Sequence, residues 1–588
     1  MFPRVVETKD GDKTYKYLRL VENKWVGGKK KQVVVAHVGR VEDCAEKVSS
    51  LIDKLRRFCS EVYLKPEEQQ LVNCAEYGPI WLAEALWKEL QVDKWFKEKF
   101  AQVKNLKIDA ERFLFAMVSN RLSEPRSEYG LWEWRKKIYW PWDENFLSAG
   151  RRKSWAELFY RVMDNVIRWK KDLETYLYFR LRDLFSISVD IAFYDITNVQ
   201  FEGEGPGIAK LGYPRHGKKN HKQVTLALLL CDGLPVGHYV FRGNHQDKTT
   251  VEAVIKDIKE RYKIGRIVWV MDRGMFTVEN LKFIEDIVKD GYIIALKRRR
   301  NKEVKKLVEE SLEGSEEINT KLKAKEIKPR PEAIDKPDKN KDKQEKDKER
   351  LIICYNKEVA QRDRLKREGI MKIVGEELAG LATRVKEGNP KNIQPIVVEA
   401  EEILSKRKAK RYFGYKVKEK GNFEYWVKEE SVAYEEKIDG KFFLRTKEKL
   451  SLKEIVEAYK NLWEIEAAFR NLKTIEEIAP VFHSADRRVR CHIFIGILAF
   501  LLEKILQKKL EACGIRKSTR EALEILRRVQ VGIMEIQENH QVYYLRRPDS
   551  EAQEILEAVG INHFPKILRY VNSELDGNFI GKTVRNRS

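Results

Sequence analysis

The sequence predicts an α/β protein built around a mixed sheet, with helical regions before and after it. Residues 186–300 alternate between apolar strands and amphipathic helices, whereas residues 41–185 and the final part of the chain repeat with a helical period. The chain has 588 residues, more than one hydrophobic core usually serves, so we expect several structural units.

The first predicted element is a β-hairpin within residues 1–40. Residues 14–38 alternate apolar and polar side chains on both sides of Gly27 and Gly28, a dipeptide that suits a tight turn. Residues 41–185 follow with a helical period and include an aromatic, basic stretch, GLWEWRKKIYWPW. We therefore expect a small hairpin followed by a helical region.

Residues 186–300 form the first part of the predicted core. The segment SISVDIAFYDITNVQFEG is typical of a strand, and HKQVTLALLLCDGLPVGHYVFRG is typical of a hairpin that turns at Asp232 and Gly233. A helix over 249–262, the buried strand RIVWVMDRG, a helix over 278–289 and the strand YIIALK follow. Three strands that can pair antiparallel, then helix, strand, helix and strand, predict a mixed sheet.

Residues 301–450 interrupt this core as an insertion that mixes helices with strands such as KFFLRTK. Its segment 325–350 has 18 charged residues out of 26 and no aromatic residue, which predicts a flexible segment. The second part of the core, 451–510, begins at Ser451, a predicted N-cap with Glu454 completing a capping box. Residues 511–588 are predicted to be a helical, basic C-terminal region.

The net charge of the chain indicates the kind of partner that it binds. The net charge of +23 favours a polyanion, most often nucleic acid. The helical region 41–185 is a candidate for binding DNA, although a helical packing domain explains its composition equally well.

The spacing of the cysteines and the hydropathy of the helices indicate the cellular compartment of the protein. The seven cysteines contain no CxxC pair, which argues against a disulfide framework or a cysteine-based zinc site and fits a reducing cytoplasm. The longest apolar helix, 493–506, is too short to span a bilayer, so we expect a buried core helix and no membrane partner.

Three acidic residues are candidates for metal-dependent chemistry. Asp195 lies in the strand IAFYDIT, Asp272 closes the strand IVWVM, and Glu466 lies on the helix after the insertion. Two-metal phosphodiester chemistry needs carboxylates that converge on hard divalent cations. With 92 acidic residues such a triple carries no weight by itself, and each member alone also fits a turn, a cap or a solvated helix face. Their positions on strands and a facing helix give the triple its weight.

The sequence YKNLWEIEAAFRNLK predicts one continuous helix with a charged face. At about 100° per residue, Tyr459, Glu466 and Lys473 fall within roughly 40° of one another, and Arg470 lies about 40° to one side. The neighbouring face is apolar and should pack on a core; it consists of Ile465, Ala468, Phe469 and Leu472. One acid among cations and a phenol suits a carboxylate that works beside a phosphate chain.

With these motifs, the sequence resembles the DDE transposases of bacterial insertion sequences, in the ribonuclease-H-like or retroviral-integrase superfamily. The relevant branch carries a β-rich insertion and the signature tyrosine, two residues, arginine, three residues, glutamate, six residues, lysine. Tyr459, Glu466 and Lys473 match it, whereas Leu462 stands at the arginine position. The segments YDIT, MDRGMF and FRGNHQDKTT also resemble the family, over about residues 110–505. The resemblance implies a ribonuclease-H-like mixed sheet flanked by helices.

The resemblance also implies roles for the site residues. Asp195, Asp272 and Glu466 would hold two Mg²⁺ ions, or Mn²⁺ in their place. The DNA backbone would be contacted by Tyr459, Arg470 and Lys473. Trp463 could stack on a displaced base, although a buried core tryptophan is the commoner case.

Other polar residues of the core have open roles. A basic run would flank the DNA path or form a plain solvated turn; it consists of Lys297, Arg298, Arg299 and Arg300. His216, His221 and His245 are interpreted as polar loop residues rather than metal ligands.

The function that follows from the resemblance is a DNA transposase. We expect it to bind the terminal inverted repeats of its element as double-stranded DNA, pair two ends as a homodimer, cleave each end and transfer the strand to target DNA. We expect it in the cytoplasm of a bacterium or archaeon, on the nucleoid when bound to DNA. Two alternatives remain: a metal-dependent nuclease of the same fold, and a transposase-derived DNA-binding regulator without catalysis, which Leu462 favours.

Overall fold

The protein is described here by a computed structural model. The described residues are 1–11, 13–27, 29–44, 69–104, 106, 108–142, 152–185, 191–201, 203–212, 221–245, 250–271, 277–296, 298–299, 302–327, 349–388, 393–418, 422–474, 477–479, 481–536 and 540–572. The chain divides into two compact units. One comprises residues 1–75, 531–546 and 565–588, and the other comprises 76–530 and 547–564.

The first unit contains an antiparallel sheet of β1 (Phe2–Asp10), β2 (Lys13–Val26) and β3 (Lys29–Arg40). Strands β2 and β3 form the hairpin expected from the sequence, and Gly27 adopts a φ of 62° in its turn. Strand β1 makes a third strand that the sequence did not reveal, because its residues are mostly exposed and lack a clear alternation of apolar and polar side chains.

A second sheet of this unit has the order β18-β17-β16-β4. It joins β4 (Gln69–Glu76) to β16 (Gln530–Ile536), β17 (His540–Leu545) and β18 (Ile567–Asn572). Residues 41–185 and 511–588 were both predicted to be helical, so these four strands correct the prediction. The strands are short and lie beside strongly periodic helices, which hide their alternating pattern.

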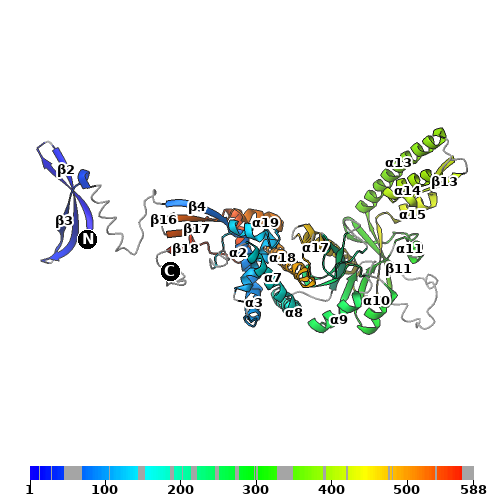
Figure 1. Cartoon of the computed structure of the whole chain (residues 1–588), viewed down its shortest axis with the longest axis horizontal. Helices are drawn as coiled ribbons and strands as arrows, with labels where there is room; N and C mark the ends of the chain where they lie inside the picture. Colours follow the sequence, from blue (N-terminus) through cyan, green and yellow to red (C-terminus); the bar gives the residue numbers. More distant parts are fainter. Residues whose placement is uncertain are drawn as a thin grey trace. The chain divides into compact units, whose positions relative to one another are not determined.

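In the second unit, helices gather around α18 (Asp486–Ala512), whose middle is almost entirely buried (Figure 1). Its neighbours include α2 (Gly78–Glu89), α4 (Ala110–Ser123) and α7 (Arg152–Val166). Other helices of the region are α3 (Val92–Ala101), α5 (Leu131–Trp134), α8 (Lys170–Phe185), α19 (Thr519–Leu526) and α20 (Ser550–Ala558). None of the described helices has the length and apolar character of a membrane span.

The aromatic stretch of the helical region packs inward. Trp134 and Trp140 are buried with their rings 5.4 Å apart, and Trp140 Nε1 donates to the carbonyl of Arg135. The guanidinium of Arg135 lies over the ring of Trp132. These contacts favour the packing interpretation of the stretch.

The central sheet has nine strands in the order β10-β11-β12-β15-β9-β8-β5-β6-β7. Strands β5 (Ile191–Gln200), β6 (Gln223–Cys231) and β7 (Leu234–Arg242) pair antiparallel, whereas β8 (Val268–Met271) and β9 (Gly291–Ala295) continue parallel to β5. This mixed order confirms the α/β fold with a mixed sheet flanked by helices that the sequence predicts. The β6–β7 turn lies at Asp232 and Gly233, whose φ values of 50° and 73° fit a type I′ turn.

The two faces of β5 meet different helices. On one face, Tyr194 donates from its hydroxyl to Thr250, at the start of α9 (Val251–Tyr262). On the other face, Phe193 and Val199 share a hydrophobic core with α18 and with α16 (Leu452–Lys460) and α17 (Leu462–Thr474). Helix α10 (Val278–Lys282), continued by a π-helical turn Phe283–Ile287, connects β8 to β9.

The insertion extends the sheet and builds a core of its own. Strand β15 (Lys441–Thr446) pairs antiparallel with β9, and β12 (Arg350–Asn356), β11 (Leu322–Ile327) and β10 (Glu316–Asn319) follow. The separate core is formed by α13 (Lys357–Gly388), α14 (Gln394–Lys406), β13 (Phe413–Lys418) and β14 (Asn422–Val427). Helices α11 (Lys302–Leu307) and α15 (Glu429–Ile438) complete the insertion.

The charged segment predicted to be flexible, 325–350, is ordered at both ends. Lys325 lies in β11, and Arg350 lies in β12, where its Nη1 donates to the carbonyls of Glu448 and Leu450 at 2.6 Å each. The rest of the segment, 328–348, lies outside the described residues.

Candidate active site

Strand β5 determines where Asp195 lies. Side chains alternate along a strand, so Asp195 shares its face with Phe193 and Thr197, and it is half-buried. Met271 pairs with Tyr194 in the parallel register of β8 and β5. These two residues immediately precede Asp272 and Asp195 in the chain, although Asp272 itself lies outside the described residues.

Helix α17 packs against the face of β5 that carries Asp195. Its apolar residues are buried in the same core as Phe193; they are Ile465, Ala468, Phe469 and Leu472. At the end of the helix, Lys473 Nζ donates to Thr197 Oγ1 at 2.6 Å. Since Thr197 is two residues beyond Asp195 on the same face, the ammonium group of Lys473 lies beside the Asp195 side of the strand.

Glu466 and Arg470 lie on the same side of α17 as Lys473. Glu466 is two helical turns before Lys473, and Arg470 is between them. Both Glu466 and Arg470 are exposed. The carboxylates of Asp195 and Glu466 thus come from a strand and from the helix packed on it, and their oxygens are the donors that hard divalent cations prefer.

The predicted single helix is broken at Asn461, so Tyr459 belongs to α16 and not to the helix of Glu466. The ring of Tyr459 stacks on Phe442 with centroids 5.7 Å apart and packs against the core. The break lets the apolar sides of α16 and α17 reach one core. The predicted common face therefore consists of Glu466, Arg470 and Lys473 only.

Leu462 occupies the position where the resemblance expects arginine, and it is 8% exposed. It opens α17 and contributes to the core beneath that helix. At this position the chain therefore uses the side chain for packing instead of a phosphate contact.

Trp463 is 61% exposed. The interpretation of this residue as a buried core tryptophan is therefore wrong. It lies at a cleft between the start of α17, the β6–β7 turn and α18. Most charged residues of the cleft are acidic: Asp232, Glu448, Glu454, Glu457, Glu464 and Glu511, against Arg266, Lys504 and Lys508. Burial raises the pKa of the Glu464 carboxyl, and nearby Lys504 opposes that shift. The excess of acidic over basic side chains disfavours a DNA backbone inside the cleft.

The basic run after β9 contacts the insertion. Arg299 pairs with Glu435 of α15, with Nη2 and Oε2 2.7 Å apart. Arg298 lies 3.8 Å from Asp363 of α13, and its carbonyl accepts from the Tyr434 hydroxyl at 2.6 Å. These pairs give the run a role in attaching the insertion to the sheet. Its ends, Lys297 and Arg300, lie outside the described residues.

The histidines near β6 and β7 make ordinary polar contacts. His221 Nδ1 lies 3.2 Å from the carbonyl oxygen of Phe201, and the exposed ring of His245 stacks on Phe241. His216 lies outside the described residues.

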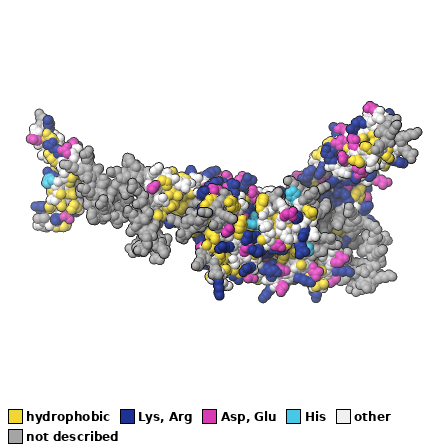
Figure 2. Space-filling view, viewed as in Figure 1, with side chains coloured by type: hydrophobic (Ala, Val, Ile, Leu, Met, Phe, Trp, Pro, Cys, Tyr) yellow, Lys and Arg dark blue, Asp and Glu magenta, His cyan; other side chains and the backbone are white. Residues whose placement is uncertain are grey.

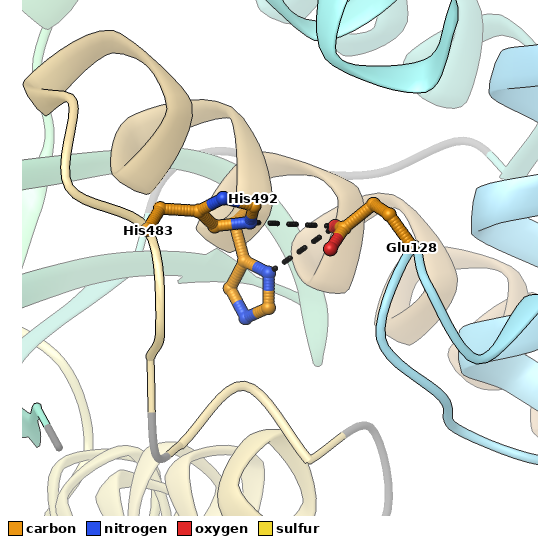
Figure 3. Close-up of side chains that lie close together, drawn as sticks. All are labelled: Glu128, His483 and His492. Atoms are coloured by element: carbon orange, nitrogen blue, oxygen red, sulfur yellow. Dashed lines mark ion pairs between the residues drawn. The ribbon is translucent and has the colours of Figure 1, made fainter. Parts of the chain in front are cut away.

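A cluster that the sequence analysis missed lies elsewhere in the same unit. Glu128, His483 and His492 point toward one another in the interior, as Figure 3 shows. The spacing of the two histidines gave no signal, because one precedes a helix and the other lies on it. Glu128 is more than 350 positions away in the sequence, so only the fold reveals the cluster.

Charges of both signs are mixed on the face of the protein that Figure 2 shows. On the face shown in Figure 2, Lys and Arg side chains are interspersed with Asp and Glu. The net charge of +23 alone therefore does not identify a DNA path on this face.

Models of two protein families match separate parts of the chain. The family model of the transposase DDE domain matches residues 190–502, and that of the N-terminal domain of IS1634 family transposases matches residues 3–69. No curated protein matches the chain. Among solved structures, the piggyBac transposase synaptic complex with hairpin DNA matches with 8% sequence identity and a TM-score of 0.35, over 77% of this chain and 79% of that one.

Proposed function

Because the chain belongs to the DDE transposases of insertion sequences, we propose that it cuts the ends of its element and joins them to target DNA. Asp195, Asp272 and Glu466 would hold two divalent cations, Mg²⁺ or Mn²⁺. When bound, these ions activate a water or a 3′-hydroxyl and stabilise the leaving oxygen. The observation that supports this most is the bond from Lys473 to Thr197, which ties the Glu466 helix to the Asp195 face of β5.

The cations on the same side of α17 would position the DNA. Arg470 is exposed and can form a bidentate contact to a phosphate, and Lys473 can offer a point charge. Trp463, at the start of the helix, could stack on an unpaired base at the rim of the acidic cleft. We propose that two chains pair as a homodimer, so that both ends of the element are held together.

The function is tested with DNA that carries the terminal inverted repeats of the element, in Mg²⁺ and in Mn²⁺. Cleavage and strand transfer are measured separately. A transposase produces both, with a preference for repeat ends over scrambled DNA. Cleavage without strand transfer would indicate a nuclease. Salt-dependent binding without cleavage would indicate a regulator and contradict the proposal.

Arg470→Ala is expected to weaken DNA binding at low salt and to reduce the slope of log K against log salt by about 0.9, the value for one lost phosphate contact. Fluorescence anisotropy over a salt series measures the slope. Arg299→Ala is the matched control, because its guanidinium is already paired with Glu435. A change in slope for Arg299→Ala equal to that for Arg470→Ala would contradict this assignment of the DNA path.

A further inference from the structure

We propose that Glu128, His483 and His492 form a second metal site, for a divalent transition metal of the Zn²⁺ type. Glu128 comes from the loop between α4 and α5, His483 from the segment between α17 and α18, and His492 from α18 (Figure 3). This site uses none of the three carboxylates proposed for the active site, and it does not depend on the proposed function.

The distances suit ligands of one ion better than hydrogen bonds. Glu128 Oε1 lies 3.4 Å from His483 Nε2 and 3.7 Å from His492 Nδ1. An N–H···O bond spans about 2.7–3.2 Å, so both separations are too long for one. Two atoms that bind the same tetrahedral Zn²⁺ at about 2.1 Å lie about 3.4 Å apart. One ligand atom from each of the three residues lies within 4.8 Å of the others. The nitrogens of His483 and His492 therefore need to move only a short distance toward each other to bind one ion.

His492 is the second observation that points to a ligand. The residue is 6% exposed, and neither of its ring nitrogens has a hydrogen-bond partner among the described residues. A buried imidazole without a partner loses its hydration without compensation. A metal ion between His492 and Glu128 would satisfy the nitrogen and balance the buried carboxylate.

The donor set indicates the kind of ion. Two imidazoles and one carboxylate are the ligands of many zinc sites, which leave a fourth position open to water. Mg²⁺ prefers oxygen ligands throughout, so it is a poor fit. The proposed site would therefore select a different ion from the one at the carboxylates of Asp195 and Glu466.

The position of the site suggests a structural role. His483 lies in the segment that leaves α17, and Val481 in this segment donates its N–H to the carbonyl of Gln200, at the end of β5. In the same segment, the carbonyl of Glu477 accepts a hydrogen bond from Arg121 of α4 at 3.1 Å. An ion held by Glu128 and the two histidines would fasten this segment to the helical region and fix the end of the helix that carries Glu466.

The test uses the full chain without an affinity tag, and with Asp195→Asn to weaken metal binding at the carboxylates. The chelator-treated protein is dialysed against Zn²⁺ in excess Mg²⁺, and retained zinc is measured by elemental analysis. Co²⁺ is then used as a probe, because its visible absorption reports nitrogen ligands and low coordination. We expect a single Zn²⁺ per chain, a raised melting temperature with Zn²⁺, and a Co²⁺ spectrum of a four-coordinate site.

His492→Ala should lower the Zn²⁺ affinity by more than the ~10–100-fold that loss of an outer partner costs. The exposed His245→Ala is the matched control and should leave retention unchanged. If His492→Ala does not fold, Glu128→Gln keeps the volume and should lower Zn²⁺ affinity by a comparable factor. Absence of stoichiometric zinc in the Asp195→Asn chain, or equal retention by the His492→Ala or Glu128→Gln variant, overturns the proposal.

Discussion

Asp195→Asn and Glu466→Gln are each expected to lower DNA cleavage by about 10³-fold or more, because each would remove a charged oxygen of a proposed metal ligand while keeping the side-chain volume. Asp195 is on the strand that faces α17, and Glu466 is on α17 itself. Neither residue is expected to contribute much to DNA affinity, which depends on phosphate contacts from cations, so binding should stay within about threefold. A gel assay of end cleavage and an anisotropy titration measure the two effects.

Glu464→Gln is the matched control for Glu466→Gln. It lies on the same helix two positions earlier, but it lines the acidic cleft on the other side of Trp463. Its removal should leave cleavage within about threefold of the wild type, the range of an ordinary change away from the reacting groups. If Glu464→Gln abolished cleavage and Glu466→Gln did not, the third carboxylate would have to be reassigned.

Glu174→Gln is expected to destabilise the second unit, which contains the nine-stranded sheet, by about 3–5 kcal/mol. This is the usual cost of leaving a buried charge without its partner. Glu174 is 5% exposed on α8 and accepts from Lys170 at 2.8 Å, from Arg261 at 3.2 Å and from the backbone N–H of His238 at 3.1 Å. It therefore joins α8, α9 and strand β7. Its loss leaves the half-buried Lys170 without its carboxylate partner and leaves Arg261 paired with Asp257 alone.

The urea midpoint and the melting temperature of the main unfolding transition measure this loss. Asp172→Asn is the control on the same helix, because its exposed pair with Lys99 at 3.4 Å should contribute less than about 1 kcal/mol. Equal stability losses for Glu174→Gln and Asp172→Asn would show that the buried network does not hold these elements together.

The same network predicts acid sensitivity. Burial lowers the pKa of His238 to about 4 from 6.5, and Lys170 adds to this shift while Glu174 opposes it. The unfolded chain therefore takes up a proton at His238 before the folded chain does, and stability falls as the pH drops from 6.5 towards 4. Burial would raise the pKa of Glu174, but Lys170, His238 and Arg261 outweigh it and lower the value to about 2. The contribution of Glu174 is thus full above its unfolded value of 4.5 and is lost at lower pH.

A series of melting temperatures from pH 7.5 to 4 tests this prediction. We expect His238→Gln to make the melting temperature depend less on pH between pH 6.5 and 4. A melting temperature of the wild type that stays constant across that window would contradict the assignment of His238 as neutral in the folded chain.

Local signals made most of the core predictable. The type I′ turn at Asp232 and Gly233 has its own residue signature, and the capping box of Ser451 and Glu454 is present as expected. Buried strands such as β6 are continuous apolar runs that end at clear turns. Where the local pattern and the tertiary environment favour the same structure, the sequence is sufficient to predict the element.

The errors arose where tertiary packing decided the outcome. The period of the helix gives no sign of the break at Asn461, which serves the packing of α16 and α17 on one core. Trp463 lies only two positions from the buried Ile465, and its exposure depends on where the cleft falls. The partner of Arg299 and the carboxylate nearest His492, that of Glu128, come from distant segments, so no local pattern could identify them.

The order of the elements along the chain has a consequence for protein synthesis. Strand β5, with Asp195, is translated about 270 residues before Glu466, and the insertion lies between them. At about 5–20 residues per second, the ribosome needs roughly 15–50 s to cover that interval. Until α16, α17 and α18 emerge, the helices that share a core with the Asp195 face of β5 are absent, and so is Glu466. A nascent or prematurely terminated chain would therefore lack one of the three proposed metal ligands, and under the proposed function only a chain synthesised past Glu466 would be able to cut DNA.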